Sequence, residues 1–179
     1  MLSLQSFHSG FALKEEVGLF EPYIDKSTYT VVGFSYGAIK AFEAVLESTT
    51  RIDRLILLSP AFFQTKPETF IKLQLRVYKA NPQKYLKQFM KGCFAPYQEV
   101  PTQEGEHSYE DLHTLLSYVW DTSKLQQLVD RGIDIEVHLG MLDAIIDVEG
   151  AQTFFKAQCC VTTYQKNNHF LLKGETNNE

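Results

Sequence analysis

The residues best suited to chemistry in this sequence are Ser35, Asp143 and His169, which follow one another in that order along the chain. A serine hydroxyl becomes a nucleophile when a neutral imidazole takes its proton. A carboxylate then fixes the tautomer of that imidazole and stabilises the imidazolium that forms. We therefore expect Ser35 to be the nucleophile, His169 the base and Asp143 its partner. The corresponding chemistry is acyl transfer through an acyl-enzyme.

Ser35 lies in the pentapeptide G-F-S-Y-G, between a β-branched run at 30–32 and an amphipathic segment that reaches about residue 47. Strand, sharp turn and helix form the context of a nucleophile elbow, in which a strained backbone exposes the serine hydroxyl. Gly33 and Gly37 fit this context because a side chain at either position would collide with the neighbouring strand or helix. The alternative is a glycine-rich turn that contains a serine by chance, and the two correct flanks favour the elbow.

A tetrahedral intermediate carries an oxyanion, which needs two hydrogen-bond donors that are already in place. We assign these donors to the backbone N–H of Tyr36, directly after the nucleophile, and to that of Phe11, in the turn after the first expected strand. The start of the helix behind Ser35 leaves further N–H groups unpaired and favours negative charge nearby.

Each assignment has competitors. The other histidines are His8, His107, His113 and His138. His113 falls in an expected helix and His138 in an expected strand, so structural roles are favoured for both, whereas His8 lies next to the oxyanion turn and keeps a claim on catalysis. Asp147 is the alternative acid, but it begins an expected helix and looks like an N-cap. No Cys/His cluster has metal-ligand spacing and no phosphate-binding loop is present, so we expect neither metal nor cofactor.

The elements that must position these residues alternate between strand and helix. Strands are expected at 2–7, at the elbow, at 54–58, at 133–139 and at 160–164, and helices at 14–23, after the elbow, at 123–131 and at 147–157. This alternation predicts an α/β fold with a parallel sheet of about five strands and flanking helices. Loops at the carboxyl ends of such strands carry the chemistry, and the turn at 8–11, Ser35, Asp143 and His169 all fall there.

Between residues 61 and 121 the strand pattern is replaced by a helical one. Two helices meet at Asn81-Pro82, which is an N-cap followed by proline at the first helical position, and a third is expected at 109–119. We interpret this block as a lid. The chain then divides into a core at 1–60 and 122–174, a lid at 61–121, and a disordered tail at 175–179.

The composition describes an ordinary single domain, with 44% hydrophobic and 22% charged residues. The N-terminus has neither the basic region nor the apolar core of a signal peptide, and no apolar run reaches the 18 or more residues of a spanning helix. The three cysteines make no disulfide framework, which favours a reducing, cytoplasmic compartment.

The charge of the lid differs from that of the rest of the chain. Residues 66–91 contain seven basic residues and one acidic residue, a formal charge of +6, which leaves −11 for the remainder of a chain whose total is −5. The expected basic faces comprise Lys72, Arg76 and Lys79 on the first lid helix and Lys84, Lys87 and Lys91 on the second. A solvated face is the simplest interpretation. Nucleic acid is disfavoured by the acidic remainder, and an acidic protein carrier fits better. Aromatic residues on the other side would cover an apolar slot for an acyl chain, namely Phe70, Tyr78, Tyr85 and Phe89.

Three motifs, G-F-S-Y-G, G-M-L-D at Asp143 and N-N-H-F at His169, resemble the α/β-hydrolase superfamily across essentially the whole chain. The chain is also similar to the short pimeloyl-acyl carrier protein methyl ester esterases of biotin synthesis, the BioV type. The features that carry this similarity are the short length, the S-G-F turn, S-Y-G-A-I-K-A-F-E, L-L-S-P and F-x-K-L-Q-L. This resemblance implies hydrolysis of the methyl ester of pimeloyl-acyl carrier protein to the free acid and methanol, with acyl carrier protein as partner. The alternatives are a thioesterase or general short-chain carboxylesterase of the same fold, or a catalytically silent binding module.

The sequence departs from the superfamily pattern at two places. Hydrolases of this kind usually have His-Gly at the oxyanion turn, whereas here Ser9 precedes Gly10 and His8 stands one position earlier. The stretch between Phe11 and Gly33 is also too short for a further strand and helix. We therefore expect a minimal sheet with a thinly covered edge or face, which a homodimer could cover.

Overall fold

The computed structural model describes residues 4–174 and contains one five-stranded sheet in which every strand runs parallel to its neighbours. The strands follow one another across the sheet in chain order, as β1 (Ser6–His8), β2 (Thr30–Phe34), β3 (Arg54–Leu58), β4 (Asp134–Gly140) and β5 (Cys160–Tyr164). This confirms the expected α/β fold with five parallel strands. The expected start of the first strand and the tail at 175–179 lie partly or wholly outside the described residues.

The elbow forms where the sequence predicts it, because β2 is followed directly by α1 (Tyr36–Glu47). All five residues of β2 are buried. One side of α1 packs on the sheet through Ala38, Phe42 and Val45, which are fully buried. β2 pairs with β1 on one side and β3 on the other. Ser35 therefore follows the carboxyl end of a strand that has neighbours on both sides.

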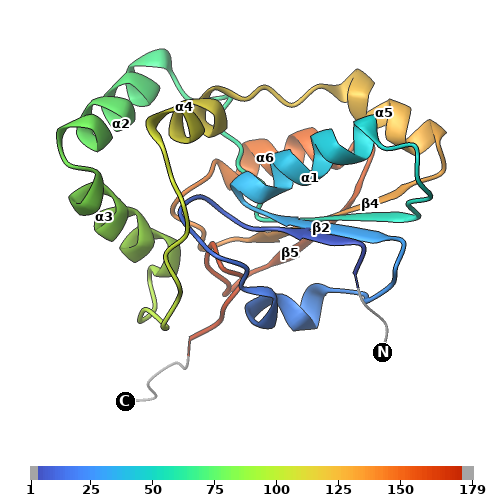
Figure 1. The fold of residues 1–179 in the computed structure, drawn as a ribbon, viewed down its shortest axis with the longest axis horizontal. Coiled ribbons are helices and arrows are strands. Elements are labelled where there is room, and N and C mark those ends of the chain that lie inside the picture. The colour runs from blue at the N-terminus through green and yellow to red at the C-terminus, as the bar shows by residue number, and fades with distance from the viewer. Residues whose placement is uncertain (1–3, 175–179) are drawn as a thin grey trace.

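The two faces of the sheet are covered unequally (Figure 1). The helices α1, α5 (Thr122–Asp130) and α6 (Val148–Phe155) lie over one face, where Leu55, Leu57 and Val137 are buried with them in the larger apolar cluster. The short 3-10 helix η1 (Val17–Tyr23) lies over the other face, with Phe20 in the smaller cluster. The expected helix at 14–23 is therefore shorter and tighter than its sequence pattern suggested.

Three helices fill the predicted lid segment between β3 and α5. They are α2 (Glu68–Ala80), α3 (Pro82–Phe94) and α4 (Tyr109–Ser117). The side chain of Asn81 caps α3 by accepting a hydrogen bond from the amide of Lys84 at 3.0 Å, as the Asn-Pro pair predicts. Figure 1 places α2 and α3 beside the end of the sheet where β2 meets α1. The lid therefore lies next to the carboxyl ends of the strands.

At the β5 edge of the sheet, Cys160 and Thr162 are exposed. On the same face, β4 presents Glu136 and His138, which are only partly buried. Whether a second copy of the chain covers this surface stays a prediction. Among residues 4–174, no helix combines the length and apolar character needed to cross a membrane.

Candidate active site

The backbone of Ser35 is strained, with φ 55° and ψ −115°, in a region that side chains other than glycine rarely adopt. The two glycines of the pentapeptide make this turn sterically feasible. A Cβ on Gly33 would lie 2.3 Å from the carbonyl oxygen of Gly37, and a Cβ on Gly37 would lie 2.0 Å from that of His8. The helix start is therefore in direct backbone contact with both β2 and the end of β1, and this contact fixes the position of Ser35.

The structure brings Ser35, His169 and Asp143 together although they are far apart in the chain. Oγ of Ser35 lies 2.9 Å from Nε2 of His169, and Nδ1 of His169 lies 2.6 Å from Oδ2 of Asp143. A carboxylate can only accept, so Nδ1 carries the proton and Nε2 is free to accept from Ser35. The arrangement can therefore remove the proton of Ser35 during attack on a carbonyl carbon.

Asp143 is held by its own loop. Its Oδ1 accepts hydrogen bonds from the amides of Ile145 at 2.7 Å and Ile146 at 3.2 Å, which leaves Oδ2 for His169. The loop begins at Gly140, the last residue of β4, where a Cβ would lie 2.3 Å from the carbonyl oxygen of Asn168. Glycine thus allows the loop that carries Asp143 to approach the one that carries His169.

The His169 loop is fixed by residues that the sequence analysis did not assign to the site. The buried Asn168 side chain donates to the carbonyl of Phe94 at 2.9 Å and accepts from the amide of Leu172 at 3.1 Å. Ser59, also buried, donates to the carbonyl of His169 at 2.7 Å. The position of Ser59 directly after a buried strand is a signal that could have placed it at this edge of the sheet.

The two expected oxyanion donors lie at the start of α1 and in the turn after β1. Among residues 4–174, the amides of Tyr36 and Phe11 donate no hydrogen bond to another protein atom. The first amides of a helix lack intrahelical partners, which accounts for Tyr36. Both amides are thus free to bind an oxyanion, and their assignment as donors stays a prediction.

The competing residues have structural partners. Asp147 caps α6 by accepting from the amide of Gly150 at 3.1 Å, and its pKa is lowered chiefly by a hydrogen bond from Thr65. His138 lies 2.9 Å from the hydroxyl of Tyr164, and His107 lies 2.7 Å from that of Tyr78. None of these groups lies within hydrogen-bond reach of Ser35, and the same holds for His8, whose ring contacts Ser6. No group of three or more His, Cys, Asp and Glu side chains in residues 4–174 is arranged to hold a metal ion.

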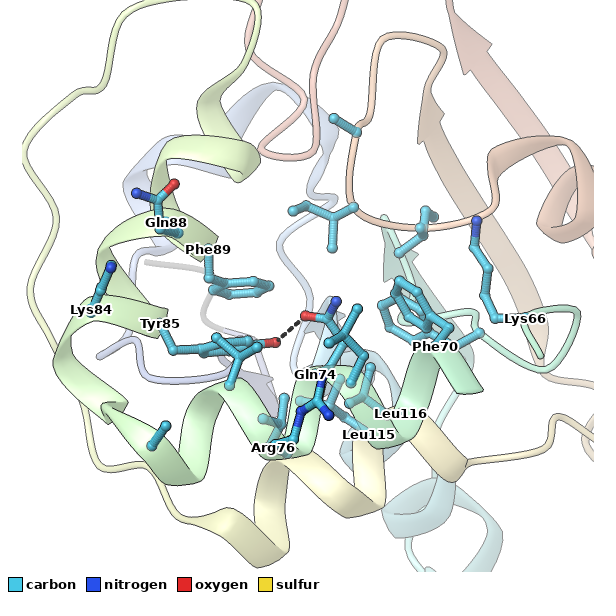
Figure 2. A pocket seen from close by; sticks show the side chains of 18 of the residues that line it. Lys66, Phe70, Gln74, Arg76, Lys84, Tyr85, Gln88, Phe89, Leu115 and Leu116 are labelled. Atoms are coloured by element: carbon cyan, nitrogen blue, oxygen red, sulfur yellow. Dashed lines mark hydrogen bonds between the residues drawn. The ribbon is translucent and has the colours of Figure 1, made fainter. Parts of the chain in front are cut away.

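A groove of about 930 Å³ opens between the lid helices and the loop that carries Asp143 (Figure 2). Its apolar walls include Phe63, Phe70, Leu73, Val77, Tyr85, Phe89, Leu115 and Ile145. Figure 2 shows the rings of Tyr85 and Phe89 extending from α3 toward α2, where the Tyr85 hydroxyl donates to Gln74 at 3.0 Å. Ser35 is only 5% exposed and does not line the groove, which reaches the site through Asp143.

The groove differs in two ways from the expected slot. Tyr78 does not line it, because its ring is buried against Phe11 and His107. Leu73 and Val77 are each 45% exposed and form part of the open wall. The apolar face of α2 is therefore less deeply buried than its sequence pattern suggests.

The basic residues of the lid are all exposed, in agreement with a charged outer face. Arg76 and Lys84 lie at the groove itself, whereas Lys72, Lys79 and Lys87 lie outside it. Lys72 forms an ion pair with Glu68 at 2.8 Å. The positive charge thus extends from the groove over the outer surface of α2 and α3.

No protein-family model matches the chain, and a search of curated proteins finds no relative. Solved structures do match. A lipase-esterase related protein from Clostridium acetobutylicum has a TM-score of 0.63 at 13% identity, with 93% of this chain and 86% of that chain covered. BioG from Haemophilus influenzae has a TM-score of 0.57 at 14% identity, with 92% and 87% covered.

An esterase from Exiguobacterium antarcticum, EaEST, matches with a TM-score of 0.51 at 17% identity over 78% of this chain. The chain spans only 59% of the length of that esterase. At these identities the matches establish the fold and leave the activity to be proposed. This chain has an α/β fold, with a five-stranded parallel sheet and flanking helices, that matches α/β-hydrolase structures.

Proposed function

We propose that this protein is a serine esterase that hydrolyses the methyl ester of a pimeloyl chain attached to acyl carrier protein. The observation that carries the proposal is the hydrogen-bonded series from Ser35 through His169 to Asp143, at 2.9 Å and 2.6 Å. The motifs that resemble the pimeloyl methyl ester esterases support the substrate, and the fold that the chain shares with an esterase supports ester hydrolysis.

In the first half of the reaction, Oγ of Ser35 attacks the ester carbonyl carbon while His169 accepts the hydroxyl proton. The negative charge on the carbonyl oxygen is stabilised by the amides of Tyr36 and Phe11. The intermediate then collapses, and the imidazolium of His169 returns the proton to the methoxy oxygen, so that methanol leaves. Asp143 stays ionised throughout and stabilises the imidazolium.

In the second half, water attacks the acyl-enzyme with His169 as base, and release of Ser35 yields the free carboxylate. The thioester that joins the other end of the chain to the carrier takes no part. An acyl chain of this kind suits the apolar groove between α2, α3 and the loop at Asp143. Its carrier end would emerge near Arg76 and Lys84, where an acidic protein meets positive charge.

The proposal is tested with purified protein and methyl-pimeloyl acyl carrier protein. The expected products are methanol and pimeloyl carrier protein, identified by mass spectrometry, with no product from the Ser35→Ala variant. Release of a free carrier thiol would identify a thioesterase. Turnover of small esters without turnover of the carrier-linked ester would identify a general carboxylesterase. Complementation of a biotin auxotroph that lacks its methyl ester esterase tests the same reaction in cells.

A further inference from the structure

Between the lid helices α3 and α4, the chain passes back across the turn that carries Phe11. Residues 103–107, here called the strap, run beside residues 12–14 (Figure 1). Leu13 and Glu104 form an antiparallel bridge. The amide of Lys14 donates to the carbonyl of Gln103 at 3.0 Å, and the amide of Gly105 donates to the carbonyl of Ala12 at 2.8 Å. Strap and turn are thus joined by backbone hydrogen bonds.

The contact is close enough to require glycine at one position of the strap. A Cβ on Gly105 would lie 2.5 Å from the carbonyl carbon of Leu13 and 2.6 Å from its oxygen. Both atoms belong to the backbone, so no side chain can rotate away to make room. Ala12 in the facing segment has φ 57°, a strained value for alanine. Surrounding contacts must therefore hold the turn in this conformation.

The side chain of Phe11 is enclosed by the lid. Its ring centroid lies 5.8 Å from that of Phe89 on α3, 6.1 Å from that of His107 in the strap and 6.2 Å from that of Tyr78 on α2. The hydroxyl of Tyr78 and Nδ1 of His107 are joined by a hydrogen bond of 2.7 Å. This bond joins the strap to α2 through two side chains that both contact the Phe11 ring.

We propose that the strap is a positioning element for the second oxyanion donor, so that the lid and the Phe11 amide move as one unit. Gly105 fixes the backbone of the turn, and the bond between Tyr78 and His107 fixes the ring of Phe11. Within the turn itself, the amide of Leu13 donates to the carbonyl of Gly10 at 3.3 Å, a long hydrogen bond. The inference rests on the proposed function, because it assigns Phe11 an oxyanion.

The first test compares Gly105→Ala with Gly18→Ala, a matched control in η1 whose added Cβ would meet nothing within 4 Å. Relief of the overlap at Gly105 needs a shift of about 1 Å, and a misplacement of that size costs up to about 10²-fold. We expect Gly105→Ala to lower kcat by roughly 10- to 100-fold with little change in KM, because the groove is untouched. Affinity for a trifluoromethyl ketone, which forms a tetrahedral adduct with Ser35, should fall by a similar factor. Unchanged kcat and ketone affinity in a folded Gly105→Ala variant would overturn the inference.

The second test uses the hydrogen bond between His107 in the strap and Tyr78 on α2. Tyr78→Phe keeps the ring against Phe11 and removes the hydroxyl, so kcat should fall while KM holds. His107→Asn can keep an acceptor near the position of Nδ1, and we expect it to retain more activity than His107→Ala. Equal activity in all three variants and the parent would count against the role of this bond and overturn the proposal.

Hydrogen exchange separates this inference from the proposed function. In Gly105→Ala, the amide of Lys14 should exchange faster than in Gly18→Ala, because its hydrogen bond to Gln103 is displaced. If the Ser35→Ala variant hydrolyses ester as fast as the parent, the proposed function fails. Faster exchange at Lys14 would still support the coupling of strap and turn in that case, and unchanged exchange would overturn it.

Discussion

Asp143 and His169 form a pair that is closed to solvent, with the Asp143 side chain 1% exposed, the His169 side chain 0% exposed and 2.6 Å between Oδ2 and Nδ1. Water therefore cannot replace either partner. The second carboxylate oxygen accepts two amides of its own loop, so the acid is oriented before substrate arrives.

The first prediction follows from this pair. Asp143→Asn keeps the size of the side chain but can present its amide N–H to Nδ1, which favours the wrong tautomer of His169. We expect kcat to fall on the order of 10⁴-fold, measured on a small chromogenic ester. Asp147→Asn is the matched control, because Asn still caps α6, and it should cost far less. A larger loss in Asp147→Asn than in Asp143→Asn would move the acid to Asp147.

Ser35→Ala should lower kcat by roughly 10⁶-fold and leave the fold intact, because the hydroxyl makes no contact that holds the sheet. Circular dichroism checks the fold, and a fluorophosphonate probe checks the nucleophile. Ser117→Ala, at an exposed position at the end of α4, is the control and should label like the parent. Substantial turnover or labelling in folded Ser35→Ala would show that another residue is the nucleophile.

The lid surface is tested by reversing charges that lie outside the groove. Lys79→Glu with Lys87→Glu should raise KM for the carrier-linked ester by about ten-fold and leave kcat nearly unchanged, because a surface field acts on encounter. The effect should shrink with salt, as the Debye length falls from about 10 Å at 0.1 M to about 3 Å at 1 M.

Two controls accompany this double variant. Lys26→Glu with Lys156→Glu reverses two exposed lysines away from the lid and should leave KM unchanged. A nitrophenyl ester never contacts the surface, so its kinetics should respond to neither variant. If the lid variant and its control behave alike on the carrier substrate, the basic surface is a solvated face and the docking of a carrier is refuted.

A fourth prediction concerns stability and pH. Burial lowers the pKa of His138 from its ordinary 6.5, with Glu136 opposing part of that effect. As the pH falls from 6.5 toward the lowered pKa of the folded state, His138 binds more protons in the unfolded chain than in the folded one, so the free energy that it contributes to unfolding should decrease. Urea unfolding above and below this pH should show a weaker dependence in His138→Gln. The exposed His113→Gln is the control, and an identical dependence in all three proteins would remove His138 as a cause.

The sheet, and the meeting of Ser35, Asp143 and His169 at one edge of it, could be predicted from sequence because both depend on local patterns. The G-F-S-Y-G turn requires its flanking strand and helix, and the short apolar run at 54–58, which Ser-Pro ends, favours a strand. Parallel strands then bring their carboxyl ends to one edge, so Ser35, Asp143 and His169 meet although their spacing in the chain is large.

The parts that sequence reasoning missed depend on contacts between distant segments. Ser59 and Asn168 hold the His169 loop through backbone groups, and no local pattern reveals which carbonyl a buried side chain will reach. Tyr78 has the same apolar periodicity as its neighbours on α2, yet it contacts the strap and not the groove. Tyr78 contacts the strap because the strap crosses residues 12–14 beside it. The helical periodicity of α2 cannot show where another segment of the chain crosses.

The lid interrupts the chain between β3 and β4, two strands that are neighbours in the sheet. The entropy lost in closing such a loop grows only with the logarithm of its length, about 0.6 kcal/mol for each doubling. Insertions and deletions among the lid helices can therefore reshape the groove, and hence the range of acyl chains it admits, with little effect on the strands that hold Ser35 and His169. The five-residue strap is the exception, because a change in its register would displace Phe11, so natural variation in the lid should concentrate on either side of residues 103–107.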